Sequence, residues 1–538
     1  MTAHTRQRFE QWLLHRTNRR RFLTGAAALT ATAQTRGRPT QVVSAESSRA
    51  TTDTPFTLGV ASGDPLPGGV VLWTRLARDP FDESGNGGMT ADPIAVRWEI
   101  ADDDSFTAIV QTGETTASPD FAHSVHVDVT GLRPGREYFY RFLANGEVSP
   151  VGRTKTAPPA DQLADRLRFG FASCAHWEHG YFAAYRELAR EEIDLVLFQG
   201  DYIYEYAPGD DYLADDDVPP PRHFAGSGPA DTLAGYRLRH GQYKTDLDLQ
   251  AAHARAPWVA TWDDHEVAND YAGSRSAVGE DVDTFLARRA AAYQAYYEHL
   301  PLRPESMPVG PDLTLYRRLR FGTLAEISVL DTRQYRSPQP CGDTVAARCD
   351  AALDPALTMT GPNQEQWLLN GLDASAARWN VISQQVMMGE LAVKILGTET
   401  LYSDDQWDGY PLARNRILHH IQGAGIRNPI VLSGDVHSAW VNDLRSDFTD
   451  PNTPVVATEF VCSSVTAINP LGDRLALILN TNPHVKFLDL RHGYTVCDVT
   501  PDRWQTDYRA FRSVERPGAE VSTIGTFVVQ NGQLGAVT

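Results

Sequence analysis

The sequence is poor in cysteine and in basic residues, and it lacks long hydrophobic runs. No stretch approaches the roughly 20 consecutive apolar residues of a membrane-spanning helix, so we expect no transmembrane segment. The 538 residues include 49 Lys and Arg against 68 Asp and Glu, which gives a net charge of −19. Because such a surface repels nucleic-acid phosphates, nucleic-acid binding is not expected. No internal repeat is apparent, and the 42% apolar content is ordinary for a globular protein.

The first 33 residues have the features of an export signal. Arg19-Arg20-Arg21 is followed by Phe22-Leu23, a short run of small and apolar residues, and Ala31-Thr32-Ala33. A basic start, a short apolar stretch and an A-x-A site are typical of a secretory signal, and the paired arginines resemble the twin-arginine type. We therefore predict a twin-arginine signal peptide at 1–33 that the twin-arginine export machinery recognises, followed by a flexible leader at 34–53. The mature protein is expected to be extracellular, attached to the cell wall or periplasmic.

The five cysteines are consistent with an exported protein. Cys341 and Cys349 lie eight positions apart in a loop and could close a small disulfide. Cys462 and Cys497 lie in strand-like segments and form a second candidate pair, which the sequence alone cannot fix. Two such pairs leave Cys174 as a free thiol that needs another role.

Two regions of the chain differ in pattern. Residues 54–157 show short alternating apolar runs separated by Gly and Pro, which predicts an N-terminal β-sandwich domain. The run Gly131–Arg141 resembles a fibronectin type III or Ig-like domain. Residues 165–538 alternate apolar strand runs with helical patterns, which predicts an α/β catalytic domain. We expect the sandwich to be a rigid spacer or a partial wall of the cleft.

Four predicted strands end in potential metal ligands. The strands 167–172, 193–199, 258–262 and 429–433 lead into Cys174, into Asp201 and Tyr204, into Asp264 and His265, and into Asp435 and His437. Because ligands bind beyond the carboxyl ends of the strands in α/β sheets, the four loops can converge on one site. A thiolate, a phenolate, carboxylates and an imidazole suit a trivalent transition metal better than magnesium or calcium. The spacing alone predicts a centre with two or more metal ions.

These blocks resemble a known family. Asp201-x-x-Tyr204, Asp264-His265-Glu266 and Asp435-x-His437 are similar to the three blocks of the purple-acid-phosphatase type of metallophosphoesterase. A more specific resemblance is to the alkaline phosphatase D (PhoD) family, and it extends from about Phe56 to the C-terminus. It is carried by Gly59–Pro65, Leu72–Arg75, Phe171–Cys174, Gly200–Glu205, Trp262–Glu266, Leu330–Arg336 and Ser433–His437. Asp264 and Asp435 replace an Asn and a His of the purple-acid pattern, which favours a harder cation at the second metal position.

The resemblance implies a fold, an activity and a set of metals. The fold is a calcineurin-like metallophosphoesterase αββα sandwich, preceded by the small all-β domain. The activity is hydrolysis of phosphate monoesters, diesters or both by attack of a metal-bound hydroxide on phosphorus. The resemblance implies that Fe(III) is bound by Cys174, Asp201, Tyr204 and His437. It places one or two Ca²⁺ ions on the oxygen side formed by Asp201, Asp264 and Asp435.

Other residues near these blocks are expected to assist. His265 is expected to bind phosphate or to protonate the leaving oxygen, and Glu266 to support its loop. Asn269 is a candidate metal or phosphate ligand. The basic residues that could reach phosphate, or serve structural pairs instead, are Arg168, Arg333 and Arg336.

Several alternatives stay open on the sequence. Some exported relatives have a phospholipase D-like activity, so a phosphodiesterase that cleaves phospholipid head groups is the main alternative. The run Thr526–Gly532 resembles a hairpin rather than the C-terminal helix that closes the pocket of some family members, which leaves room for bulky diesters. A serine-nucleophile alkaline phosphatase would need an Asp-Ser-Ala segment, which the sequence lacks. A non-catalytic surface-binding protein is disfavoured because all four blocks keep their ligands.

Overall fold

The computed structural model describes residues 54–538 except 211–221, 343–344, 395–398, 451 and 470–478. The predicted signal peptide and leader, residues 1–53, lie outside this part. None of the helices described is long and apolar enough to cross a membrane.

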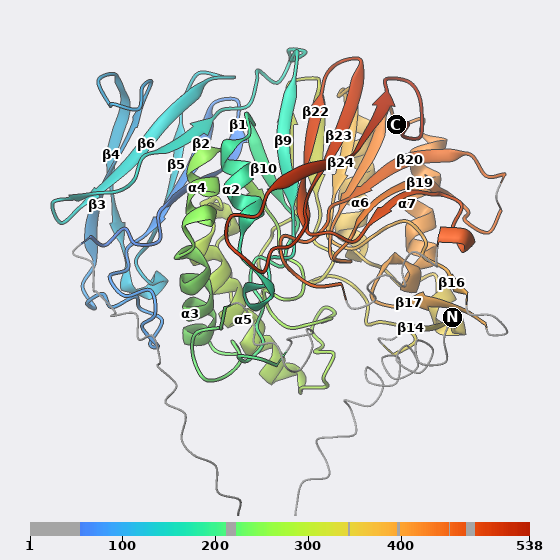
Figure 1. Cartoon of the computed structure of the whole chain (residues 1–538), viewed down its shortest axis with the longest axis horizontal. Helices are drawn as coiled ribbons and strands as arrows, with labels where there is room; N and C mark the ends of the chain where they lie inside the picture. Colours follow the sequence, from blue (N-terminus) through green and yellow to red (C-terminus); the bar gives the residue numbers. More distant parts are fainter. Residues whose placement is uncertain (1–53, 211–221, 343–344, 395–398, 451, 470–478) are drawn as a thin grey trace, which may run out of the picture. The chain divides into compact units, whose positions relative to one another are not determined.

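The larger of two central sheets has nine strands in the order β24-β23-β22-β9-β10-β11-β1-β2-β5. Figure 1 shows them side by side, from β5 and β2 through β10 and β9 to β24. The neighbours β9, β10, β11 and β1 are parallel. The strands are β24 (Val521–Gln530), β23 (Arg503–Phe511), β22 (Gly493–Val499), β9 (Leu167–Ala172), β10 (Leu195–Phe198), β11 (Trp258–Ala260), β1 (Val60–Leu66), β2 (Gly69–Arg75) and β5 (Ser124–Thr130).

The second central sheet has seven strands in the order β12-β13-β15-β18-β20-β19-β21. Its middle strands β13, β15, β18 and β20 are parallel. The strands are β12 (Arg317–Phe321), β13 (Ala325–Val329), β15 (Trp379–Ser383), β18 (Pro429–Ser433), β20 (Val455–Val461), β19 (Ala439–Arg445) and β21 (Val485–Asp489).

The two sheets pack face to face, and strand β10 shows why. Its sequence is apolar at every position. Leu195 and Leu197 pack into the core between the sheets, whereas Val196 and Phe198 pack into the core under the helices. A strand buried on both faces has this continuous apolar pattern.

Helices cover the outer faces of both sheets. Leu188 of α2 packs in one core cluster with Val196 of β10, and Ile417 of α7 packs in another with Val431 of β18. The layers are therefore helix, sheet, sheet and helix, a mixed α/β architecture. The helices on the nine-stranded sheet are α2 (Ala183–Arg190), α3 (Leu233–Lys244), α4 (Leu247–Arg255) and α5 (Val282–His299), and those on the seven-stranded sheet are α6 (Gly361–Ala374) and α7 (Pro411–Gly423). Short 3₁₀ turns are η1 (Pro119–Phe121), η2 (Trp177–His179), η3 (Pro304–Ser306), η4 (Asp350–Leu353), η5 (Trp407–Gly409) and η7 (Leu479–Thr481).

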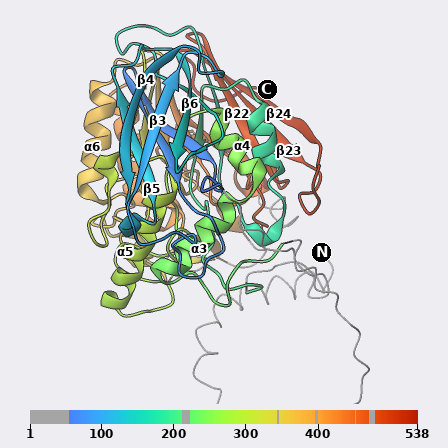
Figure 2. The same ribbon diagram turned by 90° about the vertical axis from the view of Figure 1, so that its left-hand side faces the viewer.

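In the described part of the N-terminal region, two layers of strands enclose a hydrophobic core. Five of its strands form a sheet of their own, and Figure 2 shows β3, β4 and β6 of this sheet facing the viewer. The other three strands, β1, β2 and β5, continue the nine-stranded sheet, because β1 pairs in parallel with β11. One of the two layers is thus shared with the α/β part of the chain. The five strands are β3 (Ile94–Ala101), β4 (Ile109–Ala117), β6 (Glu137–Ala144), β7 (Glu147–Val148) and β8 (Gly152–Lys155).

Of the two candidate disulfides, Cys341–Cys349 is formed and Cys462–Cys497 is not. Cys341 and Cys349 are bonded, beside a three-stranded sheet of β14 (Val345–Ala347), β17 (Thr400–Ser403) and β16 (Val393–Lys394). Cys462 and Cys497 are free and buried. Each thiol lies near a hydroxyl: Cys462 Sγ is 3.2 Å from Ser173 Oγ, and Cys497 Sγ is 3.8 Å from Thr506 Oγ1. The second candidate pair is therefore not formed.

The close packing at the junction of β1 with β11 predicts that a larger side chain at Gly63 lowers stability. A Cβ atom at Gly63 would lie 2.3 Å from the Pro301 carbonyl oxygen and 2.9 Å from that of Trp258. We expect Gly63→Ala to cost about 1–3 kcal/mol and to lower the midpoint of thermal unfolding, because backbone must shift to admit the methyl group. Gly228→Ala is the matched control, since a Cβ there meets no atom within 4 Å. Equal midpoints for the two variants would contradict this packing.

Candidate metal centre

The candidate site lies beyond the carboxyl ends of parallel strands from both sheets. The residues after β9, β10 and β11 are Cys174, Asp201 and Asp264, and those after β18 are Asp435 and His437. Several of them turn the chain sharply in the left-handed region, with φ of 61° at Cys174, 56° at Asp201, 67° at Asp435 and 51° at His437. Non-glycine residues adopt this conformation at a cost and are concentrated at functional sites. The turns direct side chains from separate strands to one place.

One end of the site combines sulfur, oxygen and nitrogen donors. Ligand atoms of Cys174, Asp201 and His437 all lie within 4.8 Å of one another. The Tyr204 hydroxyl donates to Asp201 Oδ2 at 2.9 Å and lies 3.2 Å from His437 Nε2. His437 Nδ1 is 3.0 Å from the Ile468 carbonyl oxygen, which leaves Nε2 on the side of the site. The structure thus brings together the four residues expected to bind Fe(III).

The other end is made of carboxylates. Asp201, Asp264 and His265 form a second group with ligand atoms within 4.8 Å, and Asp263, Asp264 and Asp435 form a third. Asp201 belongs to the first and second groups, and Asp264 to the second and third. The three groups are therefore continuous, and all six residues predicted as metal ligands lie in one cluster.

A buried arginine holds the carboxylate end together. Arg333 follows β13 and is fully buried. Its guanidinium pairs with Asp263, with Asp405 at 2.9 Å, with Asp435 at 3.1 Å and with Asp264 at 3.4 Å. Burial alone would lower the pKa of Arg333, but these carboxylates raise it well above its usual value. Arg333 is a structural counter-charge, engaged on every side by acids.

The remaining negative charge favours cations. Burial raises the pKa of Cys174, Asp201 and Tyr204 well above their usual values, and Asp201 raises the pKa of the other two further. Burial also lowers the pKa of His437 to about 3, so its imidazole is a neutral donor. Asp264 Oδ1 is buried, and among the described residues it makes no hydrogen bond and only the 3.4 Å ion pair with Arg333. A mixed set of anionic donors with such a weakly engaged carboxylate oxygen fits metal ions, whose charge lets such groups ionise.

His265 is held by a carboxylate. Its Nδ1 lies 2.8 Å from Glu205 Oε2, and the other Glu205 oxygen accepts from the Asn269 backbone N–H at 2.7 Å. Burial alone would lower the pKa of His265, but Asp264, Glu205 and Asp201 raise it well above its usual value. The imidazole is therefore fixed in orientation and charged when these acids are not neutralised by a metal.

Glu266 supports the loops, as the sequence predicts. Its carboxylate accepts backbone N–H bonds from Tyr202 at 2.6 Å, from Asp263 at 2.8 Å and from Asp201 at 3.1 Å. This one side chain joins the turns after β10 and β11.

The other candidates have more varied positions. The Asn269 amide oxygen accepts from the Tyr206 hydroxyl at 2.9 Å. Arg336 pairs with Asp405 at 2.5 Å, next to Arg333. Arg168 pairs with Glu191 at 2.6 Å near the start of β9, at the opposite end of the strand from Cys174. Of the three candidate arginines, two therefore lie in the site as partners of acids and one lies outside it.

Several residues of the cluster are not among the site residues expected from the sequence. Glu205 and Asp263 directly neighbour Tyr204 and Asp264, so the same sequence blocks contain them. Asp405 and Gln406, which donates to Asp435, lie between β17 and η5, where no strand-end pattern marks them.

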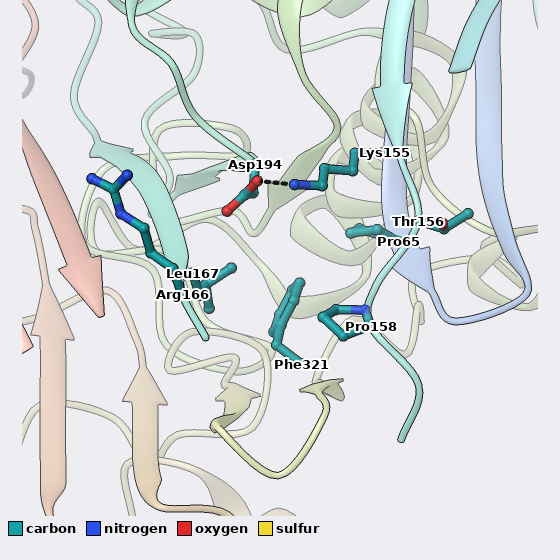
Figure 3. A pocket seen from close by; sticks show the side chains of 8 residues that line it. All are labelled: Pro65, Lys155, Thr156, Pro158, Arg166, Leu167, Asp194 and Phe321. Carbon is teal, nitrogen blue, oxygen red and sulfur yellow. Dashed lines mark hydrogen bonds and ion pairs between the residues drawn. The ribbon is translucent and has the colours of Figure 1, made fainter. Parts of the chain in front are cut away.

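A small pocket elsewhere takes no part in this site. Lys155 and Asp194 form a 2.5 Å ion pair in its wall (Figure 3). Leu167 begins β9 and Asp194 immediately precedes β10, so the pocket lies at the opposite strand ends from the candidate ligands. It is lined by Pro65, Lys155, Thr156, Pro158, Arg166, Leu167, Asp194 and Phe321.

The fold and the site define a class: a mixed α/β protein with a candidate metal centre at its strand ends. Comparison with known proteins gives the family. PhoD-like phosphatase matches residues 169–508, and PhoD-like phosphatase, N-terminal domain, matches residues 41–158. The chain belongs to the PhoD-like phosphatase family and is a phosphoric ester hydrolase.

Two relatives support this assignment. Alkaline phosphatase D of Bacillus subtilis (strain 168) is 46% identical over 486 residues, which cover 89% of this chain and 82% of that protein. A solved structure described as "Structure of PhoD" has a TM-score of 0.86 and 46% identity, covering 90% of this chain and 92% of that one.

The role of Arg333 predicts a large effect on stability. Arg333→Met leaves its carboxylate partners without their shared cation. In protein from which a chelator has removed metal, we therefore expect the free energy of unfolding to fall by about 3–5 kcal/mol. Arg168→Met is the control, because its ion pair is partly exposed and should contribute about 1 kcal/mol or less. Urea unfolding measures both. Similar small losses in the two variants would show that Arg333 does not balance the site.

Proposed function

We propose that this phosphatase is an exported, metal-dependent enzyme that hydrolyses phosphate monoesters, diesters or both, in a calcineurin-like αββα sandwich. The observation that carries the proposal is the continuity of the three donor groups through Asp201 and Asp264. A carboxylate shared between two groups can bridge adjacent cations, and paired cations are the usual means of activating water against phosphate esters.

The donor types support a proposal for the identity of the metals. Cys174, Tyr204, Asp201 and His437 would hold Fe(III), since the set combines thiolate, phenolate, carboxylate and imidazole. Asp201, Asp264 and Asp435 would hold one or two Ca²⁺ ions through oxygen alone. Asn269 stays a candidate for an additional amide ligand.

Bound cations would lower the pKa of a water from roughly 15.7 towards about 7 and neutralise charge on the phosphoryl oxygens. Side chains of the protein would position the phosphate, supply a proton and hold the carboxylates in place. Glu205 engages His265 Nδ1, so Nε2 is the nitrogen that binds phosphate or gives a proton to the leaving oxygen. Arg333 keeps the carboxylates in place and does not contact substrate, because its nitrogens are committed to acids.

Export through the twin-arginine pathway is supported by the N-terminal sequence and by the Cys341–Cys349 disulfide, a bond typical of exported proteins. That pathway moves folded proteins, which suits a centre whose ligands come from distant parts of the chain.

A phospholipase D-like phosphodiesterase is the second candidate. In the described part of the chain, β24 pairs with β23 as an antiparallel hairpin. This pairing agrees with the hairpin pattern of the sequence, and parallel assays decide between the two substrate classes.

The ligand assignment predicts the behaviour of Cys174. Cys174→Ala removes the sulfur donor, so we expect iron content and phosphatase activity to fall by about 10-fold or more. Metal analysis of protein purified without added metal measures the first, and a phosphatase assay the second. Cys497→Ala is the control, since this equally buried thiol lies on β22 and should leave both unchanged. Full iron content and activity in Cys174→Ala would refute the assignment.

The substrate class is tested by parallel assays. We expect hydrolysis of p-nitrophenyl phosphate or bis-p-nitrophenyl phosphate to stop with EDTA and to return with calcium, because the carboxylate end needs a hard cation. Phosphatidylcholine is assayed alongside them. Faster turnover of phosphatidylcholine than of either aryl ester would favour the phospholipase D-like alternative, and EDTA-resistant hydrolysis of all three would contradict metal dependence.

A further inference from the structure

A buried hydroxyl lies between two sulfur atoms at the edge of the metal centre. Ser173 is fully buried, and its Oγ is 3.1 Å from Cys174 Sγ and 3.2 Å from Cys462 Sγ. Cys462 is itself fully buried and free, and none of the chemistry above uses it. The three side chains form a chain of contacts that leads from a predicted metal ligand into the core.

The backbone holds this hydroxyl in place. The Ser173 carbonyl accepts from the Val465 N–H at 2.9 Å, and the Cys462 N–H donates to the Ser433 carbonyl at 2.9 Å. A Cβ at Gly434 would lie 2.6 Å from Ser173 Oγ, so the hydroxyl occupies the space that this glycine leaves. Ser173 follows β9, Gly434 follows β18 and Cys462 follows β20, so both central sheets fix the contact.

The direction of the hydrogen bonds follows from the charge on Cys174. A thiolate that binds a metal has no proton and can only accept. Ser173 has one O–H, which must then donate to Cys174 Sγ, and its oxygen is left to accept from the Cys462 S–H. The order is therefore Cys462 S–H to Ser173 Oγ, and Ser173 O–H to Cys174 Sγ.

We propose that Ser173 is a positioning residue for the metal centre: its hydroxyl, supported by Cys462, donates a hydrogen bond to the Cys174 sulfur and limits the electron density that this sulfur gives to the metal. Hydrogen bonds to ligating sulfur are a general means of tuning such sites, and partners of this kind commonly change metal affinity. The inference rests on the proposed role of Cys174 as a metal ligand.

Cobalt(II) is a suitable probe, because its bond to a thiolate gives a sulfur-to-metal charge-transfer absorption band. Cobalt(II) is titrated into the metal-depleted full chain, and the band position and apparent affinity are recorded. Cys174→Ser should abolish the band. Ser173→Ala should move it to longer wavelength, because a sulfur without the hydrogen bond holds its electrons less tightly, and should weaken cobalt binding by about 10- to 100-fold.

Two cysteine variants provide the matched comparison. Cys462→Ala should shift the band in the same direction as Ser173→Ala but less, and Cys462→Ser, which keeps a donor, should restore the wild-type position. Cys497→Ala, with its sulfur beside Thr506 instead, should leave the band unmoved. If Ser173→Ala fails to fold, comparing Cys462→Ala with Cys462→Ser still tests whether the hydrogen-bond chain reaches the Cys174 sulfur.

The outcomes separate the two claims. No sulfur band in the wild type would overturn both the ligand role of Cys174 and this inference. A wild-type band that is lost in Cys174→Ser, but stays unmoved in Ser173→Ala and Cys462→Ala, would leave the ligand standing and overturn the role of Ser173. An equal shift in Cys497→Ala would show a general effect of core substitutions and would overturn it too.

Discussion

Negative charge is concentrated at the strand ends, and the site is organised around balancing it. Asp201, Asp263, Asp264 and Asp435 are brought close together in a buried place, where like charges repel strongly. Arg333 pairs with several of these acids. It follows β13, so the second sheet supplies a counter-charge for Asp263 and Asp264, which follow β11 of the first. The negative charge that Arg333 does not neutralise favours the binding of metal ions there.

The layered fold explains why such a cluster can exist. Parallel strands of both sheets end at the same edge, and each turn there points a side chain into a common space. Strands buried on both faces hold these turns rigidly, since β10 is packed by helices on one side and by the second sheet on the other. The N-terminal strands extend the same sheet, so they belong to the framework that carries the site.

The positions of the candidate ligands were predictable because these residues directly follow apolar runs. The strands 167–172 and 429–433 were found with their observed bounds, and the residues beyond them lie where the α/β pattern places them. Partners contributed by irregular segments were not predictable: Asp405 and Gln406 reach Arg333 and Asp435 only through tertiary structure. The pairing of β1 with β11 was missed for the same reason, since a local pattern identifies a strand but not its neighbour. Cys462 and Cys497 show the same limit, because strand positions alone do not reveal that each thiol meets a hydroxyl.

X-ray absorption at the iron edge of the protein purified without added metal would reveal directly whether Cys174 binds a metal. We expect bound iron with one sulfur neighbour from Cys174 and oxygen or nitrogen neighbours from the other donors. The absence of iron, or iron surrounded by oxygen and nitrogen alone, would contradict this expectation.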